Sequence, residues 1–251
     1  MVYKWDLHIP KLSPELSRRA YLYLPAGYDD QPDRRFPVMY MFDGHNVFFD
    51  EDATYGKSWG MARYLDETQT PLIVAAVECN SIGNNRLEEY CPFTCEDPKL
   101  GVIRGRGRAT MNWFVHEFKP MIDANIRTLS DRSNTFICGS SMGGLMSLYA
   151  ATAFNATFGK AACLSPSLWL GAGKMRRIIN QADIAPDTLI YMDYGGEEMA
   201  NHAANLSALT SCSTALLKKG VDLTFRIAPG GTHCEASWER QIPVFMKCLG
   251  F

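Results

Sequence analysis

The segment NTFICGSSMGGLMSL, residues 134–148, carries the residues with the clearest capacity for chemistry. A short apolar run leads into GSSMG at positions 139–143, and a helical pattern follows. This is the G-x-S-x-G arrangement in the strand–turn–helix context that it requires. Glycines two positions before and after Ser141 let the strand and helix backbones approach, and the helix N-terminus favours developing negative charge. The segment therefore predicts Ser141 as the nucleophile of an acyl transfer.

A nucleophilic serine needs a base, and the chain offers five histidines, at positions 8, 45, 116, 202 and 233. The order serine, acid, histidine that accompanies this motif leaves His202 and His233. His202 lies in a helical pattern, where a histidine is typical of the surface. His233 follows the apolar run DLTFRIA and the loop PGGT, and such a loop beyond the last strand can present an imidazole to the serine. We therefore predict His233 as the base.

The acid is expected between these two residues, just past the end of a strand. The run LIYMDY is followed by two glycines and two glutamates, so Asp193, Glu197 and Glu198 all compete. Asp193 lies within the strand, where a structural role is expected. The glycine pair lets the loop turn a carboxylate toward His233, which favours the glutamates. The carboxylate would orient the imidazole and stabilise its charged form.

Two backbone N–H groups must face the oxyanion that forms during acyl transfer. One is expected from Met142, the residue after the nucleophile. The second is expected from the loop DGHN that follows the apolar run 37–42, with either His45 or Asn46 as the donor. The side chain of His45 is interpreted as a loop residue, although a second base or a ligand is the alternative.

The elements that must hold these residues alternate along the chain. Helical patterns separate the apolar runs, several of which are continuous, as is typical of strands buried on both faces of a parallel sheet. The expected strands are 20–24, 37–42, 72–77, 135–138, 160–164, 189–193 and 223–227, with 3–9 as an antiparallel edge strand. The expected helices are 60–68, 109–127, 142–153, 173–181, 200–219 and 234–248. This order predicts one α/β domain over residues 1–251, with helices flanking a mostly parallel sheet.

The composition of the chain limits the kinds of partner and the location that we expect for the protein. The 251 residues carry 25 basic and 27 acidic side chains, a net charge of −2, which gives no electrostatic reason to expect nucleic acid or an anionic membrane. No apolar run approaches the length of about 20 residues that spans a bilayer, and the N-terminus lacks a signal-peptide pattern. The eight cysteines form no CxxC pair, and reduced thiols are expected. We therefore expect a cytoplasmic protein, although a trimmed leader would leave the same sequence.

Seven segments in order resemble one family of esterases: YMFDGHNVFFD, TYGKSWG, NNRLEEYCP, GSSMGGLMSLY, SPSLW, YMDYGGEE and GGTHCEASWERQIPVFM. This family contains esterase D-like enzymes, enterochelin-type esterases, and the feruloyl and acetyl xylan esterases of carbohydrate esterase family one. The resemblance implies an α/β-hydrolase fold without metal or cofactor. Few residues separate the elbow from the acid beyond the expected strands and helices, so no large lid domain is expected. It implies Glu198 as the acid and His233 as the base. His45 replaces the glutamine that is usual in the family loop.

The resemblance and the residues together predict a serine ester hydrolase that acts through an acyl-enzyme on a small-molecule or oligosaccharide ester. Acetyl or feruloyl esters of xylan-derived sugars are the preferred substrates, with a siderophore trilactone or a simple small ester as alternatives. A non-catalytic binding protein on the same fold is the alternative from another class. Sugar rings and cinnamoyl groups both pack on aromatic faces. The candidates for that contact are Trp59, Tyr90, Trp169 and Trp238.

Overall fold

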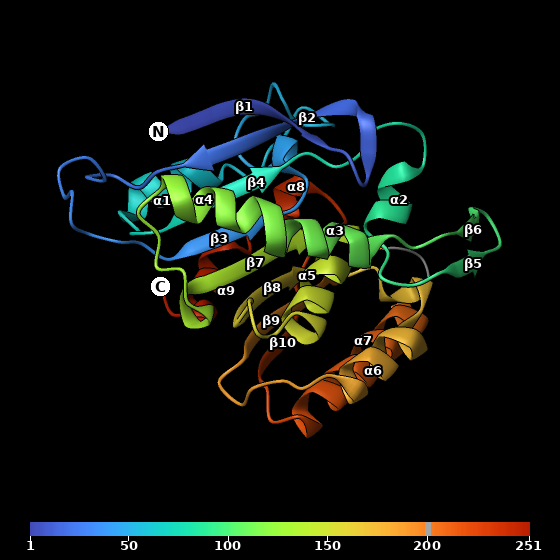
Figure 1. Ribbon diagram of the computed structural model, residues 1–251. Coiled ribbons are helices and arrows are strands. Elements are labelled where there is room, and N and C mark those ends of the chain that lie inside the picture. Colours follow the sequence, from blue (N-terminus) through green and yellow to red (C-terminus); the bar gives the residue numbers. More distant parts are fainter. Residues whose placement is uncertain (199–201) are drawn as a thin grey trace.

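The computed structural model describes residues 1–198 and 202–251, and its centre is an eight-stranded sheet (Figure 1). The strand order is β1-β2-β4-β3-β7-β8-β9-β10. β1 pairs antiparallel with β2, β2 pairs antiparallel with β4, and all later pairs are parallel. The strands are β1 Val2–Ile9, β2 Ser13–Tyr23, β3 Val38–Met41, β4 Ile73–Val77, β7 Thr135–Ser140, β8 Lys160–Leu164, β9 Leu189–Gly195 and β10 Asp222–Ala228. The mostly parallel sheet and its antiparallel edge strand are confirmed, and β2 adds a second antiparallel strand.

Helices cover both faces of the sheet, which makes a three-layer α/β fold (Figure 1). One face packs against α3 Gly107–Trp113, α4 Lys119–Asn125, α5 Met142–Ala153, α6 Ala172–Gln181 and α7 His202–Lys218. The other face packs against α1 Met61–Thr68, α8 Glu235–Glu239 and α9 Ile242–Leu249. The first two residues of the helix expected at 200–219 lie outside the described residues. In the described residues, the connections from β7 to β10 contain helices and no inserted lid domain.

Small elements complete the rim near the site. They are the short helices η1 Gly44–Asn46, α2 Asn85–Glu89 and η4 Leu168–Leu170, and the hairpin of β5 Cys95–Asp97 with β6 Gly101–Ile103. A further short helix, η3 Arg132–Asn134, precedes β7 at the opposite end of that strand from Ser141. Neither the hairpin nor α2 is predicted by periodicity, because each is too short to repeat an apolar pattern. None of the helices in the described part of the chain is long and apolar enough to cross a membrane.

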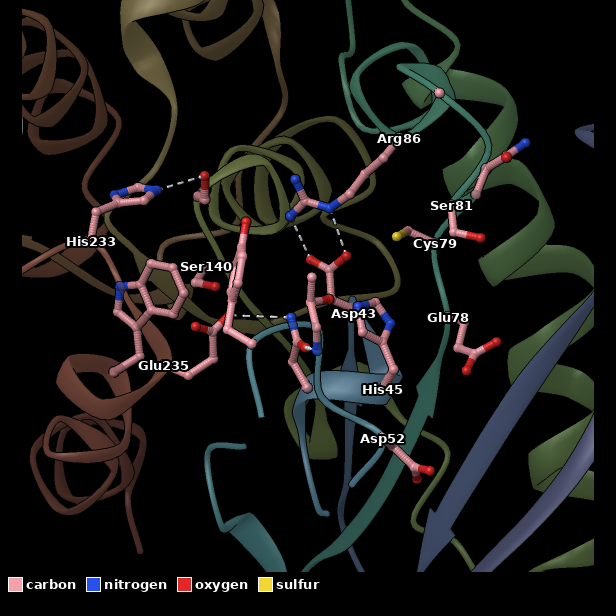
Figure 2. Close-up of a pocket in the computed structure, with 17 residues that line it drawn as sticks. Asp43, His45, Asp52, Glu78, Cys79, Ser81, Arg86, Ser140, His233 and Glu235 are labelled. Carbon is pink, nitrogen blue, oxygen red and sulfur yellow. Dashed lines mark hydrogen bonds and ion pairs between the residues drawn. The ribbon is translucent and has the colours of Figure 1, made fainter. Parts of the chain in front are cut away.

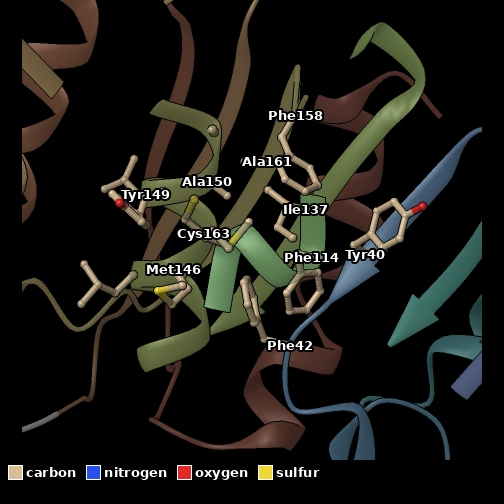
Figure 3. Packing of buried hydrophobic residues seen from close by; sticks show 14 of the residues in the cluster. Tyr40, Phe42, Phe114, Ile137, Met146, Tyr149, Ala150, Phe158, Ala161 and Cys163 are labelled. Atoms are coloured by element: carbon tan, nitrogen blue, oxygen red, sulfur yellow. The ribbon is translucent and has the colours of Figure 1, made fainter. Parts of the chain in front are cut away.

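The alternation of side chains along the central strands fills both cores. Tyr40 and Phe42 face α3 and α5, whereas Met39 and Met41 face α1 and α9. The aromatic part of the first core, around Phe114, is shown in Figure 3. Continuous apolar runs therefore become strands covered on both sides, as the sequence predicts.

The helix expected over 109–127 is divided by a π-helical turn, η2 Phe114–Phe118. Phe118 is buried there, stacked on Trp113 with ring centroids 5.0 Å apart. Met121 is 36% exposed, although the 3.6-residue period predicts it in the buried stripe. The π turn explains this difference, because its wider i→i+5 step interrupts the helical period.

The strand order reverses direction between β3 and β7, since the chain first adds β4 on one side of β3 and later adds β7 on the other. The loops that leave the carboxyl ends of these two strands diverge there and open a crevice, which is where ligands bind in open α/β sheets. Those loops hold the DGHN segment and the GSSMG segment.

Replacing Phe118 with alanine should lower the free energy of unfolding by about 3–5 kcal/mol, because it leaves a cavity in a closed aromatic cluster. Met121→Ala, a few residues along the same helical segment but partly exposed, is the control and should cost under about 1 kcal/mol. Urea denaturation of both variants measures the difference. Equal losses for the two would contradict the packing described here.

Candidate active site

Ser141 occupies a strained turn between β7 and α5. Its backbone angles are φ 57° and ψ −117°, a left-handed region that a residue with a side chain rarely adopts. Its N–H donates to the carbonyl of Leu164 at 2.9 Å, which ties the turn to β8. A Cβ on Gly139 would lie 2.7 Å from the carbonyl carbon of Gly143, and one on Gly144 would lie 2.6 Å from the oxygen of Leu164. The glycines are therefore required by close packing around the serine.

The side chains of Ser141, His233 and Glu198 form one hydrogen-bonded chain. His233 Nε2 lies 2.9 Å from Ser141 Oγ, and its Nδ1 lies 2.9 Å from Glu198 Oε2. His233 comes from the loop between β10 and α8, and Glu198 from the loop after β9. With a proton on Nδ1, the imidazole donates to the carboxylate and accepts the serine proton, which is the arrangement that general-base activation needs.

The three candidate acids have different environments. Glu197 is exposed, and its backbone N–H donates to the carbonyl of Gly231 at 2.8 Å. Asp193 is buried and accepts from the Tyr191 hydroxyl at 2.8 Å and from the Ser165 N–H at 3.1 Å. Glu198 is the carboxylate in contact with His233. The geometry therefore brings Glu198 to the imidazole and leaves Asp193 as a structural group beneath it.

Ser165 links several of these groups, although sequence reasoning does not single it out. Its hydroxyl donates to Glu198 Oε1 and accepts from Trp238 Nε1 at 3.0 Å. The ring of Trp238 stands edge-on to the His233 imidazole, with centroids 5.1 Å apart. Trp238 and Ser165 therefore hold both members of the His–Glu pair. The segment SPSLW contains the serine, but nothing in its spacing reveals a contact with a residue 33 positions away.

The loop after β3 lies beside the nucleophile and forms η1. The N–H of Asn46 donates to the carbonyl of Asp43 at 2.8 Å, so it is engaged within the turn. Of the two donors that the sequence leaves open in this loop, the geometry favours His45. Its N–H lies in the first turn of η1, as that of Met142 lies in the first turn of α5, and such amides have no intrahelical acceptor.

Arg86 fixes the start of this loop through a bidentate ion pair. Its Nε and Nη2 each lie 2.7 Å from one carboxylate oxygen of Asp43 (Figure 2). Burial alone would raise the pKa of Asp43, but the guanidinium outweighs it and holds the pKa below the ordinary value. Asp43 has φ 55°, and its N–H donates to the Tyr90 hydroxyl at 3.3 Å. Arg86 thus contributes to the site by fixing this loop through Asp43.

These groups open onto a pocket of about 500 Å³. Of the four aromatic residues that the sequence places at the substrate, Trp238 lines this pocket. The expectation is wrong for Trp59 and Tyr90, which are 3% and 1% exposed and lie outside the pocket lining. Trp169 is partly exposed beside a separate, small groove that includes His233. Most of the residues that line the pocket have polar side chains: Asp43, His45, Asn46, Asp52, Thr54, Tyr55, Glu78, Cys79, Asn80, Ser81, Gly83, Arg86, Ser140, Ser141, His233, Glu235 and Trp238.

One group of potential metal ligands lies in this pocket. Ligand atoms of Asp43, His45 and Cys79 lie within 4.8 Å of one another. Both carboxylate oxygens of Asp43 already bind Arg86, and burial raises the pKa of the Cys79 thiol far above its ordinary value. A guanidinium at 2.7 Å repels a metal cation, and a protonated thiol is a poor ligand. The donor set therefore does not favour a metal.

Comparison with known proteins identifies the family to which the chain belongs. The model of the family described as "Putative esterase" matches residues 13–247, so the chain belongs to that family. An uncharacterized protein of Bacillus subtilis (strain 168), YbbA, is 26% identical over 185 residues, which cover 72% of this chain and 69% of the relative.

Two solved structures have the same fold. An IroE-like serine hydrolase from Shewanella oneidensis superposes with a TM-score of 0.76 at 19% identity, over 99% of this chain and 79% of the other. A ferulic acid esterase superposes with a TM-score of 0.70 at 16% identity, over 100% of this chain and 98% of the other. The fold is thus that of esterases and serine hydrolases, and the predicted α/β-hydrolase class is confirmed.

Burial raises the pKa of Asp193 to about 6, despite the hydrogen bonds from Tyr191 and Ser165 that lower it. Because the folded-state pKa exceeds the ordinary value of 3.8, the stability linked to the protonated form is lost as the pH rises through about 6. Relative to Asp193→Asn, the free energy of unfolding of the wild type should fall by about 1 kcal/mol between pH 5 and pH 7.5. Urea unfolding at both pH values measures this slope, and a parallel dependence in the two proteins would contradict it.

Proposed function

We propose that the protein hydrolyses carboxylic esters through an acyl-enzyme on Ser141, with His233 as the base and Glu198 as the acid of the triad. The observation that carries this proposal is the continuous Ser141–His233–Glu198 chain, with both contacts at 2.9 Å, on a nucleophile held in a strained turn. Strain at such a turn is a feature of nucleophile elbows, where the side chain must stand clear of the backbone.

The mechanism follows from the geometry. His233 takes the proton of Ser141 as its oxygen attacks the ester carbonyl, and Glu198 stabilises the imidazolium that forms. The N–H groups of Met142 and His45 are the proposed donors to the oxyanion. The alcohol leaves with the proton from His233, and water then attacks the acyl-enzyme with the same histidine as base. No step requires a metal or a cofactor.

The lining of the pocket bears on the substrate. Both a feruloyl group and a sugar ring could pack on aromatic faces, yet two of the four candidate aromatic residues lie in the core, so the pocket offers less aromatic surface than the sequence suggests. The pocket instead presents short polar side chains such as Thr54, Asn80 and Ser81. We therefore favour an acetyl or similarly small ester of a polar alcohol, with a xylan-derived sugar as one such alcohol, over a feruloyl ester or a siderophore trilactone.

Turnover of p-nitrophenyl acetate tests the reaction itself. The wild type should release p-nitrophenol and Ser141→Ala should not, because the variant has no nucleophile. Turnover that survives in Ser141→Ala would overturn the assignment, and no turnover in either protein would favour the non-catalytic binding role. A panel of acetylated xylo-oligosaccharides, methyl ferulate and a trilactone, compared by kcat/KM, then ranks the substrates.

The identity of the acid gives a matched pair of variants. Glu198→Gln should lower kcat by about 10²–10⁴-fold, because an amide can neither stabilise the imidazolium nor hold its tautomer as firmly. Glu197→Gln, the same change one residue earlier at an exposed position, should leave kcat within about twofold, because surface substitutions have small effects. Steady-state kinetics with p-nitrophenyl acetate measures both. A larger loss of kcat in Glu197→Gln than in Glu198→Gln would contradict the assignment of Glu198 as the acid.

His45 should act through its backbone. His45→Ala keeps the N–H group, so kcat for p-nitrophenyl acetate should stay within about threefold of the wild type, far from the 10²–10³-fold loss that follows removal of an oxyanion donor. Circular dichroism confirms that the variant is folded. A fall of kcat by a hundredfold or more with folding intact would show instead that the imidazole takes part in catalysis.

A further inference from the structure

The pocket that contains Ser141 has more acidic than basic groups. Among the described residues, four carboxylates line it, together with the guanidinium of Arg86. Two of the carboxylates have counter-ions: Arg86 pairs with Asp43, and Lys4 Nζ lies 2.6 Å from Asp52. In residues 1–198 and 202–251, no ion pair of this kind reaches Glu78 or Glu235. The pocket therefore has two carboxylates without a counter-ion.

Glu235 is the more deeply buried of the two. It begins α8 and is 5% exposed, and its Oε1 accepts from the neutral amide of Asn46 at 3.3 Å. Burial raises the pKa of Glu235, and the negative charge of Asp43 raises it further, against the lowering effects of a backbone N–H and of the His233 and His45 imidazoles. A buried carboxylate without a cationic partner is costly to ionise. A cation bound in the pocket would remove that cost.

Glu78 follows β4 on the other side of the pocket. Its Oε2 accepts from the backbone N–H of Arg19 at 3.0 Å, and its Oε1 accepts from the hydroxyl of Tyr21 at 3.3 Å. The guanidinium of Arg19 instead lies 3.4 Å from Asp6. Neutral donors therefore hold Glu78 in place, and the guanidinium of Arg19 interacts with Glu78 more weakly than with Asp6. Figure 2 shows Glu78 and Glu235 on either side of His45.

We propose that this pocket selects esters that carry a positive charge, which the carboxylates of Glu78 and Glu235 attract. The inference depends on the proposed esterase function and adds the class of its substrate. Charges of one sign in a concave site focus the field and raise the local concentration of oppositely charged ligands. Tyr55, an exposed aromatic residue in the same lining, adds a face on which an ammonium group can rest. Esters that carry a carboxylate or a phenolate are disfavoured by the same charges.

A pair of isosteric esters isolates the charge. Acetylcholine and 3,3-dimethylbutyl acetate have the same acyl group and nearly the same shape, but only the first has a charge. We expect the ratio of their kcat/KM values to be about tenfold higher in the wild type than in Glu78→Gln/Glu235→Gln, on the scale of electrostatic focusing. Comparing ratios between proteins cancels the different intrinsic reactivities of the two esters.

The cation can lie in either half of the ester, and a second pair distinguishes the halves. Ethyl 4-(trimethylammonio)butanoate and ethyl 5,5-dimethylhexanoate place the charge in the acyl group. The pair with the larger drop in ratio between the wild type and the double variant identifies the half that lies over the two carboxylates. Glu67→Gln, the same change at an exposed position on α1 outside the pocket, is the control and should keep the wild-type ratios.

Equal ratios in the wild type and the double variant for both pairs would overturn charge selection. If the double variant does not fold, the wild-type ratios should still fall as salt is raised, because salt screens the two carboxylates. Ratios that do not change with salt would likewise overturn the inference.

Turnover of p-nitrophenyl acetate, an ester without a charge, distinguishes failure of the proposed esterase function from failure of charge selection. If it is not turned over, calorimetric binding of tetramethylammonium still tests the pocket. Binding that is tighter in the wild type than in Glu78→Gln, Glu235→Gln or both supports the inference, and equal binding in all of these proteins overturns it.

Discussion

The backbone of Ser141 is the constraint on which the site depends. A serine at φ 57° and ψ −117° is held there by β7, by α5 and by the hydrogen bond from its N–H to β8. The close contacts at Gly139 and Gly144 allow the strand, turn and helix to meet at this point. The strain is offset by two packed cores on either face of the sheet. The fold therefore serves to hold one hydroxyl clear of its backbone, in reach of His233.

Two hydrogen-bonded networks then position the groups around that hydroxyl. On one side, Ser165 and Trp238 hold Glu198 and His233. On the other side, the Arg86–Asp43 ion pair fixes the loop that offers the His45 N–H. Each network joins segments that are distant in sequence, and their hydrogen bonds satisfy polar groups that would otherwise be costly to bury. The same preorganisation leaves Glu78 and Glu235 facing the pocket without counter-ions, which connects the architecture of the site to the charge of its substrate.

Much of this could be predicted from the sequence, because the informative signals are local. The apolar runs and the GSSMG turn depend on neighbouring residues, so they predict the strands, the elbow at Ser141 and the base His233. Among the three candidate acids, only the family resemblance singles out Glu198. Contacts between distant segments leave no such signal. Trp59 and Tyr90 are aromatic and near the expected site in sequence, yet each packs inward, because a residue's type does not reveal which way it faces in a loop. Ser165 and Glu235 are ordinary in their local context, and the folded structure reveals their roles.

The central claim is that Ser141 carries the acyl group, and trapping the acyl-enzyme tests it most directly. Protein mixed briefly with p-nitrophenyl acetate and quenched in acid should gain the mass of one acetyl group, located by peptide mass spectrometry on the peptide that contains Ser141. We expect this label in the wild type and its absence in Ser141→Ala. An acetyl group found on another residue, with turnover unchanged in Ser141→Ala, would contradict it.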